Sequence, residues 1–163
     1  MLMVNNIIDN TVYPIVIKSR GIRYLTLYYY TDHSDAVLND GSKSILYFKS
    51  EEAMSLFCNS LGLNKDGNVY EYDFDAPLTN QIDYKRVLEN WNLLNTIAGV
   101  FGMYFEGNLR KYTPLYDLLF CLNTSAVPIP DTYTASEKHL KYILKVFRKK
   151  DRFLGRFELY EEE

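Results

Sequence analysis

The sequence predicts an α+β domain in which a small, mostly antiparallel sheet from the N-terminal half is packed by helices mainly from the C-terminal half. Segments typical of strands come first, and apolar residues at helical spacing dominate only from residue 83 onward. The two patterns do not alternate regularly, which argues against a doubly wound parallel sheet. The 163 residues, 47% of them apolar, suffice for a single domain over 1–163 with its own core.

Three segments near the start have the composition of strands. Tyr13–Ile17 is expected to be extended, and Pro14, which lacks a backbone N–H, predicts an edge position for it. Ile22–Tyr30 is rich in Tyr, Leu and Ile and is the clearest strand. A polar connection over residues 31–44 then leads to a short strand at Ile45–Phe48.

The next segment has the signals of a short amphipathic helix. Ser50 is suited to cap its start, and Gly62 is suited to follow its end. The expected apolar stripe consists of Ala53, Leu56, Phe57 and Leu61.

A strand with strict alternation is expected over Val69–Asp75. Its aromatic residues point one way and its carboxylates the other, the two sets being Tyr70, Tyr72 and Phe74, and Glu71, Asp73 and Asp75. This period of two is typical of a strand with one buried and one wet face.

Three helices are expected in the C-terminal half. The longest runs from Asp83 to Gly102, with an apolar face formed by Val87, Leu88, Trp91, Leu94, Ala98 and Phe101. Thr113 is suited to cap the second, with Pro114 at its first position. The third begins near Ala135 or Ser136, after a loop over 126–131, and should bury Leu140, Ile143, Leu144 and Phe147. Whether residues 153–160 are helix or strand stays open.

The chemical inventory argues against an enzyme. The two histidines and the two cysteines, Cys58 and Cys121, show no paired metal-ligand spacing, and both cysteines are expected to be reduced core thiols. No phosphate-binding glycine motif is present. We therefore expect no catalytic residue, no metal and no cofactor.

The chain also has no sign of a secretory signal or a membrane span. Its longest apolar run, Ile97–Phe105, is about half of the roughly 20 residues that a spanning helix needs. We expect a soluble, cytoplasmic protein without a membrane partner.

Tyrosines and carboxylates near the predicted sheet suggest a surface for protein recognition. The net charge is −3, and opposite charge speeds encounter while tyrosines bind at low entropic cost. Such a patch would attract a basic protein partner. The candidate contact residues are Tyr28, Tyr30, Asp32, Asp35, Glu71, Asp73 and Asp75.

One stretch resembles a known family. It consists of Trp91–Ala98, then Tyr104–Gly107, then Lys111–Phe120, so that the likeness covers about 84–122. This pattern resembles immunity proteins of bacterial polymorphic toxin systems, notably those of contact-dependent growth inhibition. The resemblance implies a small cytosolic protein that binds and blocks the C-terminal toxin domain of its own system. Many such toxins are nucleases that act on tRNA, other RNA or DNA.

Two other functions stay open. Residues 137–156 carry eight basic and two acidic side chains, which suits a nucleic-acid-binding module or the solvated face of an amphipathic helix. A small hydrolase would use Asp73, Asp75 or His33. The adjacent residues Asp32, His33 and Ser34 do not suit a catalytic triad, because adjacent side chains project in different directions.

Overall fold

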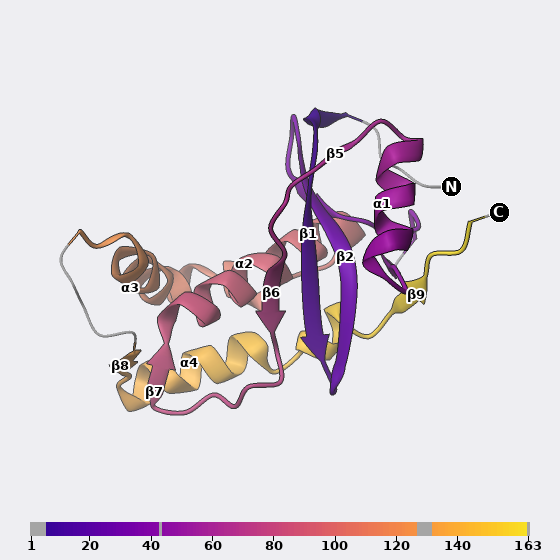
Figure 1. The fold of residues 1–163 in the computed structure, drawn as a ribbon. Helices are drawn as coiled ribbons and strands as arrows, with labels where there is room; N and C mark the ends of the chain where they lie inside the picture. The colour runs from indigo at the N-terminus through magenta and orange to yellow at the C-terminus, as the bar shows by residue number, and fades with distance from the viewer. Residues whose placement is uncertain (1–5, 43, 127–131, 163) are drawn as a thin grey trace.

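The computed structural model describes residues 6–42, 44–126 and 132–162 (Figure 1). The predicted α+β class is confirmed, with a mixed, mostly antiparallel sheet built by the N-terminal half. The helices are α1 (Glu51–Ser60), α2 (Tyr84–Phe101), α3 (Thr113–Thr124), α4 (Glu137–Phe147) and α5 (Lys150–Phe153), with 3-10 turns η1 (Glu106–Asn108) and η2 (Arg110–Tyr112). The strands are β1 (Ile7–Ser19), β2 (Ile22–Thr31), β3 (Asp35–Val37), β4 (Ile45–Tyr47), β5 (Asn64–Lys65), β6 (Tyr70–Asp73), β7 (Gln81–Asp83), β8 (Thr132–Thr134) and β9 (Phe157–Leu159).

A long hairpin forms the middle of the main sheet. β1 and β2 pair antiparallel and are joined by a two-residue turn, Arg20 and Gly21, whose φ angles are 53° and 74°. Positive φ at both positions suits the right-handed twist of a hairpin. β3 adds antiparallel to β2, whereas β5 and β6 both run parallel to β1.

The edge position predicted from Pro14 is wrong, because β1 has neighbours on both sides. β5 pairs with Thr11 and Val12, and β6 pairs from Ile15 onward, so Pro14 lies where the ladder passes from one strand to the other. Its missing N–H therefore leaves no ladder hydrogen bond broken there. A proline is tolerated in a central strand when the neighbouring strand is interrupted opposite it.

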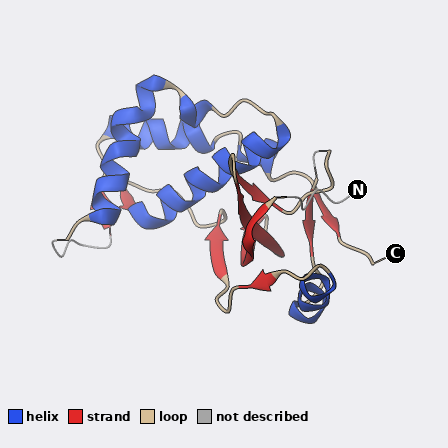
Figure 2. Ribbon diagram, turned by 90° about the horizontal axis from the view of Figure 1, so that it is seen from above, coloured by secondary structure: helices blue, strands red, loops and turns tan. Residues whose placement is uncertain are grey.

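Both faces of the sheet are covered. One face carries Ile15, Ile17 and Val37 and packs against α2, and the other carries Val12 and Leu27 and packs in a separate cluster with α1. Figure 2 shows α1 on one side of the strands and the other helices grouped on the opposite side. Neither face of the middle of the sheet is therefore exposed to solvent.

The cap of α1 is confirmed, but its apolar stripe is partly wrong. The Ser50 hydroxyl accepts a hydrogen bond from the Ala53 amide at 3.1 Å. Leu56 and Leu61 are 64% and 48% exposed, whereas Met54, Phe57 and Cys58 are buried. The helix is rotated from the predicted orientation because the sheet takes up the face that carries Met54 and Cys58.

The predicted limits of α2 are confirmed, and the predicted cap of α3 is wrong. Asp83 accepts a hydrogen bond from the Arg86 amide at 3.1 Å, and Gly102 ends α2 with a φ of 61°. Thr113 makes no capping hydrogen bond, because η2 leads directly into α3 and already places Thr113 in helical conformation.

The C-terminal segment forms a helix and then returns to strand. α4 begins where predicted, with Ser136 as its cap, but Leu144, which was predicted to be buried, is 46% exposed. Residues 157–159 form β9, which pairs parallel with β4 and so answers the question left open for 153–160. Cys121 is exposed, which corrects its predicted burial, because it lies on the outer face of α3. Residues 127–131 of the expected loop lie outside the described part of the chain.

Candidate functional site

A cavity of about 590 Å³ opens between the main sheet and the helices α2 and α3. It brings together Tyr28, Tyr30 and Asp35, three of the predicted contact residues, and gives them a helical wall that the sequence did not predict. Its lining is made of tyrosines, carboxylates and amides, with a few smaller side chains: Tyr13, Ile15, Tyr28, Tyr30, Asp35, Tyr70, Tyr72, Glu89, Asn92, Leu93, Asn95, Thr96 and Tyr116. This size lies within the range of roughly 300–1,000 Å³ that is common for ligand pockets.

The sheet wall follows from strand pairing. Tyr13 lies opposite Tyr28, and Tyr30 lies opposite Asp35, so these side chains share one face of the sheet. Tyr70 joins them because it pairs with Ile15 of the same face. Edge-to-face contacts fix the rings, with centroids 5.7 Å apart for Tyr13 and Tyr30 and 5.4 Å apart for Tyr28 and Tyr30.

The helix wall is a polar stripe along α2. Glu89, Asn92 and Thr96 recur at intervals of three and four residues and therefore lie on one face of the helix. Tyr116 of α3 closes this wall, and its hydroxyl donates to the side-chain oxygen of Asn92 at 2.8 Å. Tyr116 is thereby held in place at the rim.

The electrostatics of the cavity favour a cation. It contains two carboxylates, and no lysine or arginine is among its lining residues. Asp35 accepts a short hydrogen bond from the Tyr28 hydroxyl, and burial together with this bond raises the pKa of Tyr28. Within the described part of the chain, Glu89 accepts no hydrogen bond and forms no direct ion pair, and the charge of Lys85 one turn earlier on α2 acts on it from outside the lining.

The same surroundings shift the pKa values of two more side chains in the cavity. Partial desolvation beside the cavity wall raises the pKa of Glu89, although its side chain stays exposed, and the charge of Lys85 opposes this effect. Burial, with a smaller effect from the charge of Glu89, raises the pKa of Tyr72 to about 12. At neutral pH Tyr72 is therefore a neutral hydroxyl, and its ring is available for contact with a cation.

The other predicted contact residues lie outside the cavity. Asp32 is exposed in the β2–β3 connection, and Glu71 points away from the cavity and pairs with Arg23 at 2.7 Å. The expected carboxylate ladder on one strand is wrong, because β6 ends at Asp73 and Asp75 follows in a turn. As toxin contacts these residues stay a prediction.

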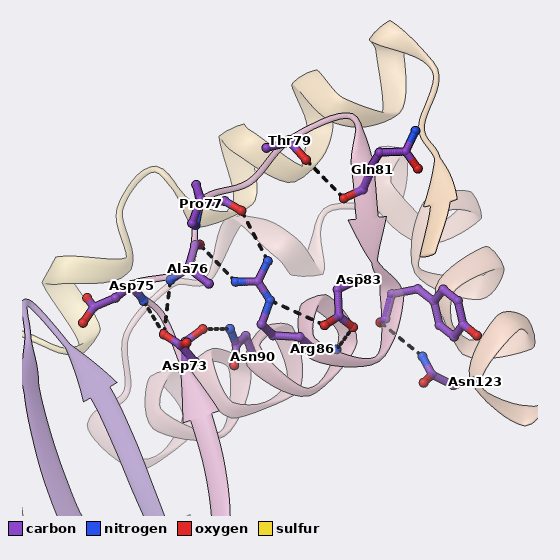
Figure 3. Close-up of polar contacts among 11 residues, drawn as sticks. Asp73, Asp75, Ala76, Pro77, Thr79, Gln81, Asp83, Arg86, Asn90 and Asn123 are labelled. Carbon is purple, nitrogen blue, oxygen red and sulfur yellow. Dashed lines mark hydrogen bonds and ion pairs between the residues drawn. The ribbon is translucent and has the colours of Figure 1, made fainter. Parts of the chain in front are cut away.

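Asp73 organises the turn after β6 (Figure 3). One carboxylate oxygen accepts hydrogen bonds from the amides of Asp75 and Ala76, at 2.9 and 3.2 Å. Partial burial raises the pKa of this carboxyl, but these bonds outweigh that effect and hold it below its ordinary value. Arg86 donates to the carbonyl of Ala76 at 3.0 Å, and Asn90 donates to the carbonyl of Asp73 at 2.9 Å, so α2 anchors the same turn.

Asp75 joins this turn to the tip of the β1–β2 hairpin. Its two carboxylate oxygens accept from the amides of Arg20 and Gly21 at 2.7 and 2.8 Å. These are charge-assisted bonds to two amides that the tight turn leaves without partners in the ladder. Asp75 therefore has a structural role in holding the hairpin turn, and no catalytic role is needed to explain it.

Substituting Asp75 by alanine is expected to lower the free energy of unfolding by about 1–2 kcal/mol, because two charge-assisted hydrogen bonds at an exposed site are replaced by bonds to water. Denaturant unfolding measures the loss, and hydrogen exchange at Arg20 and Gly21 should accelerate. Glu158→Ala, an exposed carboxylate in β9, is the control and should stay within about 0.5 kcal/mol. Equal stability of the two variants would contradict the assigned role.

The cavity residues that the predicted contact set did not contain include Tyr13, Tyr116 and four polar residues of α2, namely Glu89, Asn92, Asn95 and Thr96. A signal existed for those on α2, since Glu89, Asn92 and Thr96 form a polar stripe at helical spacing beside the apolar one. Tyr13 and Tyr116 gave no such signal, because only pairing of β1 with β2 and packing of α3 on α2 bring them to the cavity.

The described residues contain neither a candidate metal cluster nor a membrane-spanning helix. No group of three or more histidine, cysteine, aspartate or glutamate side chains there could hold a metal ion. In the same part of the chain, no helix is long and apolar enough to cross a membrane.

Comparison with known proteins identifies a similar fold and no family. No family model matches the chain, and no curated protein matches it. A solved structure, described as the crystal structure of the SatS C-terminal domain in complex with bromine, aligns with a TM-score of 0.55 at 15% identity. The alignment covers 93% of this chain and 95% of that one. At this identity the likeness concerns the fold alone.

Proposed function

We propose that the chain is an immunity protein that binds a toxin domain in the cytoplasm and blocks it, with the tyrosine cavity as the contact site. The main support for this contact site is the composition of the cavity. Six tyrosines and two carboxylates converge there from β1, β2, β3, β6, α2 and α3. Aromatic side chains and unbalanced charge at one concave place are typical of the centre of a protein interface.

The immunity role rests on the resemblance over 84–122, and the cavity is compatible with it. A nuclease toxin needs a cationic surface to hold its phosphate substrate, and an acidic partner complements such a surface. Binding at or beside the toxin's substrate cleft would exclude nucleic acid. The antidote needs no catalytic group of its own for this action.

The test is co-purification of the tagged full-length chain with the polypeptide encoded immediately upstream. We expect a stoichiometric complex that protects cells producing that polypeptide. Its dissociation constant should rise as salt is added, because charge complementarity is screened. Absence of both the complex and the protection would overturn the proposal.

Two variants distinguish toxin binding at the cavity from toxin binding at the surface that carries Glu71. Tyr28→Ala with Tyr30→Ala removes two rings of the sheet wall, whereas Glu71→Ala removes a carboxylate that points away from the cavity. We expect the double variant to weaken binding by about 1,000-fold, since two aromatic residues at the centre of an interface contribute about 2 kcal/mol each. A loss confined to Glu71→Ala would assign binding to the other face.

The basic helix α4 supports a second function, binding of nucleic acid. Lys138, Lys141 and Lys145 are exposed and recur at helical spacing. Lys141 forms a weak ion pair with Glu137, at 3.9 Å between two exposed side chains. This reading predicts affinity for RNA or DNA that falls steeply with salt and is lost in Lys138→Ala with Lys145→Ala.

A further inference from the structure

The tyrosine cavity has two carboxylates and no positively charged side chain in its lining. Asp35 is bonded to Tyr28, but the carboxylate of Glu89 has no hydrogen-bond or ion-pair partner within the described residues. A carboxylate that is partly removed from water is unfavourable unless a cation or donor meets it. Lys85, four residues before Glu89 on α2, acts on this carboxylate through its charge but does not line the cavity. A cation inside the cavity therefore has to come from another molecule.

The walls favour one kind of cation. Six aromatic rings surround the space, and a cation over a ring face is attracted by the electrons of the ring. A guanidinium is planar, stacks on aromatic faces and is more weakly hydrated than an ammonium, so it enters a cavity of this kind at lower cost than a lysine does.

The polar groups of the cavity also match a guanidinium. It has five N–H donors and no acceptor, and it therefore needs acceptors around it. The carboxylate of Glu89 is free to accept, and the phenol oxygens of Tyr30 and Tyr70 lie on half-exposed side chains at the rim. The side-chain oxygens of Asn92 and Asn95 already accept from Tyr116 and Asn108 and are less available.

We infer that the cavity is a receptor for an arginine side chain, held between tyrosine rings and paired with Glu89. This inference rests on the proposed function, in which the toxin domain supplies that arginine. It deepens the proposal by naming the chemical group that the cavity recognises. The arginine lies on an exposed segment of the toxin, because the cavity opens to solvent and admits a side chain with part of its backbone.

The experiment is a titration of the full-length chain with N-acetylarginine amide, followed by NMR of the backbone amides. We expect saturable shifts of cavity residues. N-acetylcitrulline amide, which has the same shape without the charge, is expected to bind about tenfold or more weakly. N-acetyllysine amide should bind more weakly than the arginine compound, because its ammonium is more strongly hydrated.

The variant is Glu89→Gln, which keeps the shape of the side chain and removes its charge. Arginine affinity should fall by about fivefold or more, since a charge-assisted contact becomes a neutral one. Glu158→Gln, an exposed carboxylate in β9 away from the lining, should leave it unchanged.

Stability distinguishes a binding role of Glu89 from a structural one. Because the folded-state pKa of Glu89 is raised, the ionised carboxylate costs stability once the pH exceeds the folded pKa, and the cost disappears below the unfolded pKa. At pH 7 Glu89→Gln should therefore melt at the same or a higher temperature than the parent. A lower melting temperature would mean that Glu89 is structural and would overturn the inference.

The results separate this inference from the proposed function. Equal binding of the arginine and citrulline compounds, no binding of either, or shifts away from the cavity would overturn the arginine receptor, even if a toxin complex forms. Selective binding of the arginine compound with no toxin complex would support the receptor and overturn the immunity role.

Discussion

Replacing Asn92 with arginine is expected to weaken the proposed toxin binding strongly and leave the protein folded. Asn92 is exposed on α2 and lies three residues after Glu89, so the new guanidinium can pair with that carboxylate from inside the chain. It would occupy the place proposed for the toxin's arginine and repel a second cation. Repulsion and loss of a buried pair each cost several kcal/mol at interfaces, so we expect the dissociation constant to rise by at least about 100-fold.

Asn59→Arg is the matched control. Asn59 is also an exposed helical asparagine, but it belongs to α1 on the opposite side of the sheet. It adds the same charge without reaching the cavity. The measurement is the dissociation constant of each variant at two salt concentrations. If the two variants weaken binding equally, the effect is one of overall charge and the cavity is not the contact site.

Replacing Trp91 with alanine is expected to lower the free energy of unfolding by about 3–5 kcal/mol, the usual cost of removing a large buried aromatic side chain. Trp91 is only 2% exposed. Its ring makes edge contacts with Tyr116 at 5.8 Å and with Tyr112 and Phe147 at 6.4 Å. It therefore joins α2 to α3, η2 and α4.

Denaturant unfolding of Trp91→Ala measures this cost, with Leu56→Ala as the control. Both residues are large and apolar, but Leu56 is 64% exposed and should change stability by less than about 0.5 kcal/mol. A small effect at Trp91 would show that the helical layer is held by other contacts. A large effect at Leu56 would show that another surface covers it in solution.

The stretch that resembles immunity proteins is mainly a packing motif. Trp91 and Phe105 are buried, and a Cβ added to Gly107 would lie 2.8 Å from the Trp91 ring nitrogen and 2.6 Å from the Phe105 ring. Glycine is required there because the backbone passes so close to both rings. The cavity residues Asn92, Asn95 and Tyr116 are interspersed in the same stretch. A motif of this kind determines how the helices pack. The side chains between its packing positions can vary without disturbing this packing, and they can therefore determine which partner is bound.

Local signals in the sequence determined the fold class and the limits of the longest helix. Strand-like composition and one period-two segment before residue 80, with a 3.6-residue period after it, predict α+β, and Asp83 and Gly102 limit α2 where capping chemistry places them. Ser50 and Ser136 cap their helices for the same reason. These features depend on neighbours within a few residues, which a sequence displays directly.

Strand pairing and helix packing decided the order of the strands and the composition of the cavity. Pro14 is central because β5 and β6 meet opposite it, and residues 157–159 are strand because β4 is available to pair with them. The same holds for the site: Tyr28, Tyr30 and Asp35 were visible as candidates, but Tyr13, Glu89 and Tyr116 reach them only across strand pairs and a helix packed on the sheet. Contacts between residues distant in the chain depend on the free energy of the whole packed core, which no local pattern contains.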